Sequence, residues 1–393
     1  MIRCLLAQPE PMMIRLGGLL PVCGDSILRV LHVLNELKHS GAEVMLFTAS
    51  GVWRRLGVTG DVLTAGIQRG DYAPRLEKAG YQLWLLPFSR TLGFILRVLR
   101  FFRDHREFDA VHIHAERASF VYALAAYLTG NRKILRTIHA AFPFEGPLRL
   151  NRGLQRRIMR TCLGVEMIAV SHSVAEREME AFRNPTRVIL NWFDEGHFIP
   201  PSSQQRTAAR RVVGIPSDAL AVVTVAGSNP LKNPSAVLEG FTSFAESEYV
   251  VLLWVGEPGD EVRRTASGLV GAGSVVFLGV LDDPLVALHA ADVFLMPSLR
   301  EGLAIAAGEA MGAGLPAILA DVPGLRDFRE ICEGIIWIEP TAEAVSAALR
   351  KISDMPPQAR RDLGVQLSRS ARNAFPIERG ARMYADLYMN RAL

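Results

Sequence analysis

Short apolar segments alternate with amphipathic helical segments along most of the chain, and this alternation constrains the fold more than any other feature. Apolar segments of this length, separated by helices, are typical of parallel strands that are buried on both faces. One stretch, residues 191–205, interrupts the alternation with prolines, serines and glutamines and reads as an interdomain linker. We therefore predict an α/β protein with two Rossmann-like, doubly wound domains that face a central cleft.

The first domain is predicted to open with a strand at residues 2–7, followed by a loop that contains the pair Gly17-Gly18. The apolar residues that follow predict a helix over residues 27–40 and a strand at residues 44–47. This order of strand, glycine-containing loop, helix and strand is a βαβ unit. A glycine pair without the full GxGxxG pattern fits either a phosphate-binding loop or an ordinary turn.

The remaining apolar segments predict strands in both domains. They lie near residues 82–86, 109–112, 133–138, 165–170, 187–190, 221–226, 249–255, 275–278, 293–296 and 334–338. We expect roughly seven strands in the first domain, which covers residues 1–192, and a second domain of similar size over residues 193–376. Three helices close the chain, the last at residues 377–389.

The stretch from 292 to 318 is predicted to form a strand, a turn, a helix rich in small residues and a second strand. Glu301 ends the turn, and the amides of Gly302 and Leu303 behind it are candidates for an anion site at a helix start. Glu309 follows eight residues later, about two helical turns, so both carboxylates can face one groove. The alternative is a capped helix in which Glu301 only complements the helix dipole.

Two further candidates lie where predicted strands end. Lys232 stands at the start of a helix, where a lysine opposes the helix dipole unless it faces a bound anion such as a diphosphate. His139 ends a strand of the first domain, where it can contact a sugar or assist proton transfer. A solvated lysine and a structural histidine are the alternatives.

His112 and His114 lie two residues apart on one predicted strand and so point to the same face. No further ligand stands at a spacing typical of zinc sites, so we favour packing for this pair and expect no metal. The chain also lacks a P-loop, an HExxH sequence and a nucleophile elbow.

The net charge of +4 is unevenly distributed, since residues 1–190 contain 26 Lys and Arg against 16 Asp and Glu. Arginines mix with large apolar residues around residues 91–104 and 148–160. Both segments suit an anionic membrane surface, although core-facing helices with charged outer faces are the alternative. No segment is apolar enough to predict a transmembrane helix, and no charged-then-apolar leader is present at the N-terminus. We expect a cytoplasmic protein, either free in the cytoplasm or peripheral on the inner face of the cell membrane.

These motifs together resemble those of the retaining glycosyltransferases of family 4, which have the two-domain GT-B fold. The most specific match is Ser298, Glu301, Gly302, Glu309 and Ala310 at the family's spacing, with Gly314 and Pro316 behind them. Supporting matches are Gly17-Gly18, the strand Asp109–His114, the strand that ends in His139, and the linker Asn191–Asp194.

The resemblance implies a donor that is a nucleotide-diphosphate sugar, with UDP-sugars favoured, and transfer to a glycan, glycolipid or small-molecule acceptor without metal or cofactor. By this match Glu309 holds the ribose, while Glu301 and the amides of Gly302 and Leu303 hold the donor sugar and phosphate. Lys232 neutralises the diphosphate. Ser298 and Ser228 lie beside the donor, Gly17-Gly18 approaches it from the first domain, and His139 contacts the sugar. The last helix, with residues 377–393, is expected to cross back to the first domain.

The chain departs from the family pattern at two positions. Ser228 stands where the family usually has an arginine, so one diphosphate cation is missing or comes from elsewhere. Trp192 replaces the usual glycine of the linker. A nucleotide-sugar 2-epimerase of the same architecture and a non-catalytic two-lobed sugar-binding protein remain alternative functions. Nucleic acid is not an expected partner.

Overall fold

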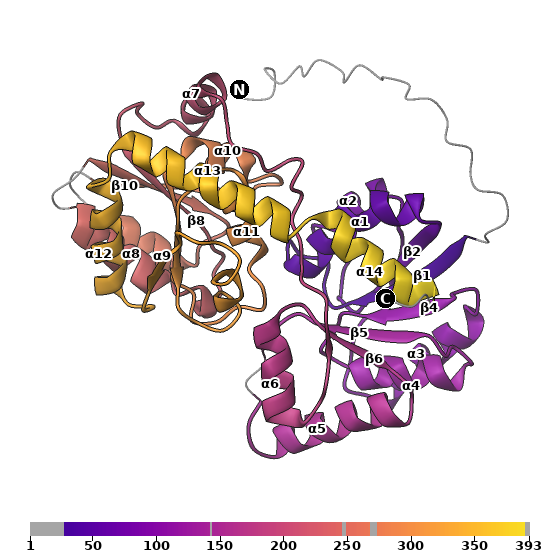
Figure 1. Cartoon of the computed structure of the whole chain (residues 1–393). Coiled ribbons are helices and arrows are strands. Elements are labelled where there is room, and N and C mark those ends of the chain that lie inside the picture. Colours follow the sequence, from indigo (N-terminus) through magenta and orange to yellow (C-terminus); the bar gives the residue numbers. More distant parts are fainter. Residues whose placement is uncertain (1–26, 142–143, 246–248, 268–272, 390–393) are drawn as a thin grey trace, which may run out of the picture.

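The computed structural model describes residues 27–141, 144–245, 249–267 and 273–389, which form two lobes, each built on a parallel sheet (Figure 1). The first sheet has the strand order β3-β2-β1-β4-β5-β6-β7, and the second has the order β10-β9-β8-β11-β12-β13. Each sheet reverses its direction of growth beside its first strand, which is the arrangement of a doubly wound fold. The predicted fold class is confirmed.

Among its described residues the first lobe has seven strands and six helices, and α14, the last described helix, packs on it. The strands are β1 (Leu28–Leu34), β2 (Val58–Thr64), β3 (Gln82–Leu85), β4 (Ala110–Ile113), β5 (Ile134–Ile138), β6 (Glu166–Ala169) and β7 (Arg187–Val188). The helices are α1 (Gly41–Arg55), α2 (Ala73–Lys78), α3 (Leu92–Asp104), α4 (Ser119–Leu128), α5 (Gly146–Thr161) and α6 (His172–Phe182), with α14 (Ile377–Met389) added from the end of the chain.

The described part of the second lobe has six strands, with helices on both faces. The strands are β8 (Leu220–Val225), β9 (Val250–Val255), β10 (Gly273–Gly279), β11 (Val293–Met296), β12 (Ala317–Ala320) and β13 (Ile336–Ile338). The helices are α7 (Ser203–Val213), α8 (Pro234–Ala245), α9 (Asp260–Ser267), α10 (Leu285–Ala290), α11 (Ile305–Gly312), α12 (Ala342–Ser353) and α13 (Pro357–Ala374), with short 3₁₀ turns η1 (Pro230–Lys232) and η2 (Arg326–Phe328).

The prediction for the start of the first lobe is wrong. Residues 28–34 form the central strand β1 rather than a helix, and the segment 44–47 lies inside helix α1 rather than in a strand. Val30 and Leu34 face one core while Leu31 and Val33 face the other, so both faces of β1 are buried. A strand that is buried on both faces is mostly apolar, here with Arg29 and His32 as exceptions, and such a segment also satisfies the spacing of a helix. The predicted strand at residues 2–7 lies outside the described residues.

Two further elements, β2 and α7, were not predicted, because the sequence of each lacks the pattern typical of its structure. Strand β2 contains Gly60 and Asp61, which are both uncommon in strands. Helix α7 is mostly polar and lies in the segment that reads as a linker, but Ser202 and Gln205 form a capping box at its start. Local hydrogen bonds therefore define this helix better than apolar periodicity does.

The linker joins the lobes through two large side chains that lie in different cores. The Trp192 side chain is buried in the first lobe, where its Nε1–H donates to Thr48 Oγ1 at 2.9 Å. Phe193 is buried in the second lobe against Gly308 and Gly312 of α11. The tryptophan that replaces a linker glycine is thus a packing residue that fixes the linker to the first lobe.

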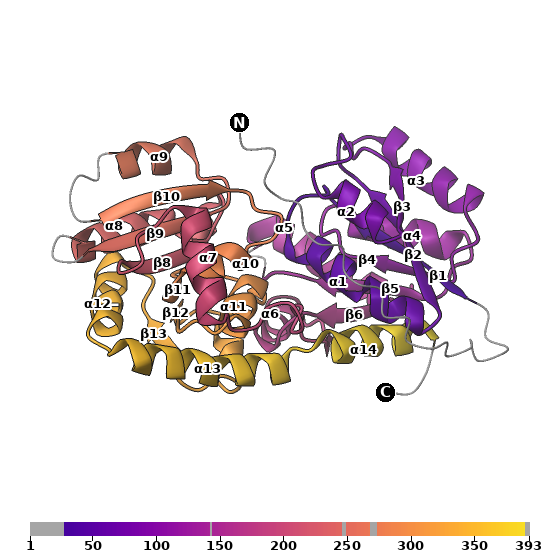
Figure 2. The ribbon, with the colours of Figure 1, turned by 90° about the horizontal axis from the view of Figure 1, so that it is seen from above.

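The last two helices connect the lobes a second time. Helix α13 lies along the second lobe and α14 along the first, so the pair spans both (Figure 2). Ala381, Tyr384 and Tyr388 of α14 are buried in the core of the first lobe. The Trp53 indole also donates to the Ala381 carbonyl at 2.9 Å. The chain therefore passes between the lobes twice, at the linker and between α13 and α14.

No helix among the described residues is both long enough and apolar enough to span a bilayer.

Gly380 should be essential for the packing of α14. A Cβ atom at this position would lie 2.2 Å from the ring of Trp192, so Gly380→Ala should lower the free energy of unfolding by about 1–3 kcal/mol. Gly51, within α1, is the matched control because its nearest neighbour would be the Arg55 guanidinium at 3.9 Å. Gly51→Ala should raise the stability by about 0.5–1 kcal/mol through helix propensity. Urea unfolding of both variants measures the difference, and equal stabilities would contradict this packing.

Candidate active site

Two loops of the second lobe form the candidate site, and hydrogen bonds hold them together. One loop follows β8 and ends in η1, which carries Lys232, and the other follows β11. The Leu299 amide donates to the Leu231 carbonyl at 2.8 Å, and the Asn233 side chain donates to the Pro297 carbonyl at 3.1 Å. Both loops leave the carboxyl ends of neighbouring parallel strands, which is where ligands bind in open α/β sheets.

Lys232 and Glu301 form an ion pair across these loops. The Lys232 Nζ lies 2.8 Å from Glu301 Oε1, and the two side chains are 27% and 12% exposed. The Glu301 amide in turn donates to the Pro323 carbonyl at 3.2 Å, which fixes the backbone of the second loop. A lysine ammonium has three donors, so Lys232 can keep this partner and still contact an anion.

Glu301 is not at the start of a helix, contrary to the expectation. Helix α11 begins at Ile305, so Glu301, Gly302 and Leu303 lie in the loop before it, and only Glu309 is on the helix. The amides of Gly302 and Leu303 nevertheless have no acceptor among the described residues. The predicted anion site is therefore available, but a loop presents it instead of a helical first turn.

The site lies where the two lobes touch. A Cβ atom on Gly302 would lie only 1.9 Å from the carbonyl oxygen of His139, which follows β5 of the first lobe. The Ser171 hydroxyl, also in the first lobe, donates to the Gly302 carbonyl at 2.8 Å. The structure thus brings Lys232, Glu301, Gly302 and His139 together at one seam between the lobes.

Glu309 lies on α11, and its charge contributes to the raised pKa of Tyr72 in the first lobe, for which burial is the largest cause. Burial raises the pKa of the Glu309 carboxyl to about 8, and the negative charges of Asp283 and Asp194 add to this shift. Part of the residue still reaches the surface, so a ligand can contact it. A carboxyl that is neutral near pH 7 without ligand becomes a stronger acceptor once donors such as ribose hydroxyls arrive.

The other predicted site residues differ in their surroundings. Ser298 is fully buried, and its hydroxyl has no partner among the described residues. Ser228 is exposed on the loop after β8. Gly17-Gly18 lies outside the described residues. The glycine that approaches the second lobe from the described part of the first lobe is Gly41, where a Cβ would lie 3.3 Å from the Ile305 side chain.

Several contacts between the lobes could not be predicted from sequence motifs. Asp327 of η2 accepts hydrogen bonds from the amides of His172 and Ser173 at the start of α6, so one lobe caps a helix of the other. The Nε atom of Arg75 in α2 lies 3.6 Å from Oδ1 of Asp282 in the second lobe. No local pattern marks these residues, because each contact depends on how the lobes are placed.

The histidines of the first lobe form a larger group than the sequence suggested. His32 of β1 lies beside His112 and His114, and ligand atoms of all three are within 4.8 Å of one another. His32 thus lies beside the pair as a third imidazole that spacing in the sequence did not reveal, and the absence of a bound metal stays a prediction. His112 nevertheless uses both ring nitrogens, one with Tyr388 Oη at 2.6 Å and one with Thr137 Oγ1 at 2.7 Å.

Replacing Glu309 by glutamine should change how stability depends on pH. The folded-state pKa of about 8 exceeds the value near 4.5 that applies when the chain is unfolded, so the folded state holds one more proton between these values. Stability of the wild type should therefore fall as the pH rises through this range. Glu309→Gln lacks this loss, so its melting temperature relative to wild type should rise from about pH 5 to about pH 9. A constant difference would show that the carboxyl ionises normally.

The comparisons with known proteins agree with this geometry. The family profile "Glycosyltransferase Family 4" matches residues 30–197, and "Glycosyl transferases group 1" matches residues 205–369. EpsF of Bacillus subtilis, a glycosyltransferase by name, is 27% identical over 82% of this chain and 89% of its own. The UDP-Gal:alpha-D-GlcNAc-diphosphoundecaprenol alpha-1,3-galactosyltransferase of Escherichia coli is 25% identical over 56% of this chain and 59% of its own.

The fold also matches solved structures. The crystal structure of Anabaena Alr3699/HepE in complex with UDP-glucose superposes with a TM-score of 0.76, over 92% of this chain and all of that one, at 18% identity. The family profiles cover both lobes, and the loops that carry Lys232 and Glu301 lie within the second profile. The chain belongs to family 4 of the glycosyltransferases and has the GT-B fold.

Proposed function

We propose that the protein is a retaining glycosyltransferase that moves a sugar from a nucleotide-diphosphate sugar to a glycan, glycolipid or small-molecule acceptor. The observation that carries this proposal is the ion pair of Lys232 and Glu301 beside the amides of Gly302 and Leu303. A cation and two backbone donors with no described acceptor are suited to a diphosphate that gains charge as it departs. The proposed nucleotide-binding domain is residues 193–376, and the acceptor domain is residues 1–192 with 377–393.

The arrangement of the two carboxylates suggests how the donor lies. Glu309 would hold the ribose hydroxyls, while Glu301 and the Gly302 amide would hold the sugar and phosphate. The buried Ser298 hydroxyl and exposed Ser228 would lie at the phosphate side. UDP-sugars are the favoured donors, and the UDP-glucose complex of HepE is the precedent for this choice. His139 would contact the transferred sugar.

The proposed chemistry needs no cofactor or metal ion from the protein. The acceptor hydroxyl would attack the anomeric carbon from the face that the diphosphate leaves, so that the configuration is retained. A phosphate oxygen of the leaving group would take the acceptor's proton. Lys232 and the two amides would stabilise the developing charge, as fixed donors in a dehydrated site can.

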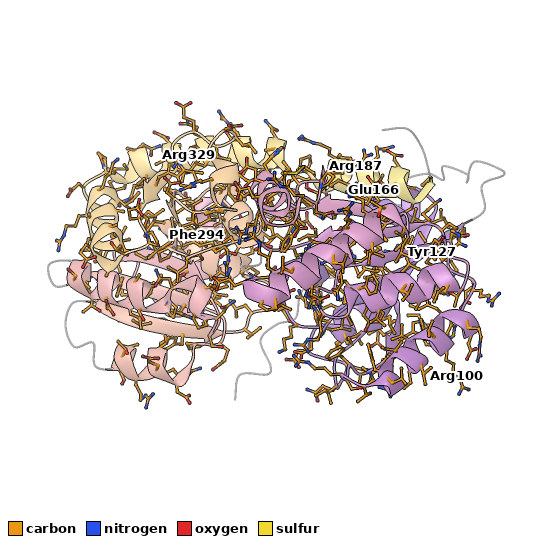
Figure 3. All side chains as sticks on the ribbon, turned by 90° about the horizontal axis from the view of Figure 1, so that it is seen from below. Arg100, Tyr127, Glu166, Arg187, Phe294 and Arg329 are labelled. Atoms are coloured by element: carbon orange, nitrogen blue, oxygen red, sulfur yellow. The ribbon has the colours of Figure 1, made fainter. Side chains whose placement is uncertain are left out.

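The outer surface of the first lobe suggests a membrane-bound acceptor. Helices α3, α4 and α5 cover one face of the first sheet, since their inner side chains share one core. On the outer side of α5, Leu150 and Leu154 are 77% and 56% exposed, and on α3 Leu92 and Leu96 are 70% and 58% exposed. Figure 3 looks onto this side of the molecule and labels Arg100 of α3.

The charge of this surface favours an anionic bilayer. Helix α5 contains five arginines and no acidic residue, but Arg156 is buried in ion pairs with Glu116 and Glu178. Arg157 lies on the same face as Leu150 and Leu154 by helical spacing. Apolar side chains among arginines are typical of helices that lie in a membrane interface. Helix α5 begins seven residues after His139 in the sequence. We place the protein at the inner face of the cell membrane, where it would meet a lipid-linked acceptor.

Lys232→Met should lower the turnover of the nucleotide sugar by about 10²–10³-fold, because the leaving diphosphate loses its cation. Lys351→Met, which removes an exposed lysine of α12, is the matched control and should keep full activity. Lys232→Arg should recover part of the loss. Release of nucleoside diphosphate with an acceptor panel measures turnover, and equal rates for Lys232→Met and wild type would overturn the site assignment.

The same assay separates the other functions. A 2-epimerase would convert the donor without any acceptor, and a sugar-binding protein would bind the donor without turnover. NMR of the glycoside product would give the anomeric configuration, and an inverted product would contradict retention. Thermal-shift measurements with a panel of nucleotide diphosphates and their sugars identify the base, because a ligand stabilises the folded state that binds it.

Replacing Leu150 and Leu154 by serine should weaken binding to vesicles that contain anionic lipid by about tenfold, since two apolar side chains no longer enter the interface. Val212→Ser removes an apolar residue that is 74% exposed on α7 and should leave binding unchanged. Sedimentation with vesicles of phosphatidylglycerol and phosphatidylcholine measures the partition. Equal binding of neutral and anionic vesicles, or of both variants, would contradict this surface.

A further inference from the structure

We propose that His114 is a positioning residue which, with His32 behind it, holds His139 in a single neutral tautomer that carries its proton on Nδ1, the ring nitrogen left for a ligand at the seam between the lobes. The inference rests on the proposed function for its catalytic consequence, whereas the tautomer itself follows from the structure of the first lobe.

The three rings form a hydrogen-bonded row across neighbouring strands. His32 Nδ1 lies 3.2 Å from His114 Nε2, and His114 Nδ1 lies 3.0 Å from His139 Nε2. The row starts at β1 in the core and ends after β5, where the His139 carbonyl meets Gly302. The remaining nitrogen, His139 Nδ1, has no hydrogen-bond partner in the part of the chain that the structure describes.

A neutral imidazole carries one N–H, so two successive hydrogen bonds through His114 must run in the same direction. In the first case all three rings carry the proton on Nδ1, so each ring donates to the next one toward the seam between the lobes. In the second case all three carry it on Nε2, so each ring donates to the next one toward the core. His139 Nδ1 is a donor at the seam in the first case and an acceptor without a proton in the second.

The far end of the row decides between the two cases. His32 Nε2 is buried and has no partner among the described residues. Its surroundings are Gly60 and the ring of Tyr81. If the row donated toward the core, this atom would be a buried N–H without an acceptor, which is rare and costly. If the rings donate toward the seam, His32 Nε2 is instead an acceptor with an unused lone pair, which costs less free energy than a buried N–H without an acceptor.

The surroundings keep the rings neutral and aligned. Burial lowers the pKa of His32 to about 3 and that of His139 to about 4, and it lowers the pKa of His114 well below its ordinary value. The titratable groups that face the row are His112, Tyr81 and Tyr388, and Tyr384 lies behind His112. The His112 ring lies with its centroid 3.9 Å from that of His114, and Thr137 and Tyr388 hold its own nitrogens.

The consequence is a defined role for His139 at the site. A fixed Nδ1–H can donate to an oxygen of the donor sugar or of the leaving diphosphate, but it cannot accept a proton from the acceptor hydroxyl. This matches a reaction in which a phosphate oxygen takes that proton. The ionisation of His139 should then be missing from the pH dependence of kcat between about pH 6 and pH 9.

Long-range ¹⁵N–¹H NMR of the full chain labelled at histidine tests the tautomer directly. We expect His139, assigned by its loss in His139→Gln, to show a protonated Nδ1 and a bare Nε2, with His114 alike. A protonated Nε2 on His139, or an imidazolium at about pH 7, overturns the proposal. Elemental analysis that finds stoichiometric metal on these rings overturns it as well.

Two variants of His114 separate positioning from simple packing. Glutamine offers one acceptor and one donor, so His114→Gln can keep the direction of the row, whereas His114→Leu cannot. We expect His114→Leu to lower kcat about tenfold with KM for the donor little changed and to mix the His139 tautomers, and His114→Gln to recover most of both. An unchanged kcat and tautomer in folded His114→Leu would contradict the role. A protein without any nucleotide-sugar turnover would refute the proposed function but leave the tautomer measurement valid.

Discussion

The close approach of Gly302 to the carbonyl of His139 is the contact on which the site depends. No side chain fits at this position, because a Cβ would lie 1.9 Å from the carbonyl oxygen. The backbone of the second lobe's loop therefore lies directly on the end of β5. This contact places the ion pair of Lys232 and Glu301 opposite the first lobe, and it leaves the amides of Gly302 and Leu303 without partners in the described chain.

The rest of the chain keeps the two lobes in this relation. Trp192 and Phe193 are consecutive, yet each is buried in a different lobe, so the linker has little freedom at this point. The packing of α14 against Trp192 through Gly380 provides the second crossing. Asp327 then caps α6 from across the seam. Each contact is local, but together they define where a donor held by one lobe would meet residues of the other.

The sequence predicts the fold well where a strand or helix has one clear pattern. Helices α4, α13 and α14 have the predicted boundaries, and the strand before the site, Val293–Met296, is also confirmed. The prediction fails at β1, because its five apolar residues lie on both faces of the strand and satisfy helical and extended spacing equally. It fails at β2 because the strand contains residues that are uncommon in strands, and at α7 because the helix is mostly polar and its capping box, rather than apolar periodicity, marks its start.

The candidate site was likewise predictable only in part. Lys232, Glu301 and His139 were predicted from their places at strand ends, and the structure brings them together, but their roles stay predictions. The pairing of Lys232 with Glu301 and the approach of His32 to His114 could not be predicted, since these partners are separated by 69 and 82 residues. Contacts at such separations follow from the order of strands in the sheet, which no single motif records.

Hydrogen–deuterium exchange with and without a nucleotide-diphosphate sugar tests the central claim most directly, because it reports where the donor binds on the whole chain. The account predicts slower exchange in the segments 226–233 and 298–309 and at the end of β5 near His139. Protection should be lost in Lys232→Met at the same donor concentration. Protection restricted to other segments, or equal protection in that variant, would contradict the account.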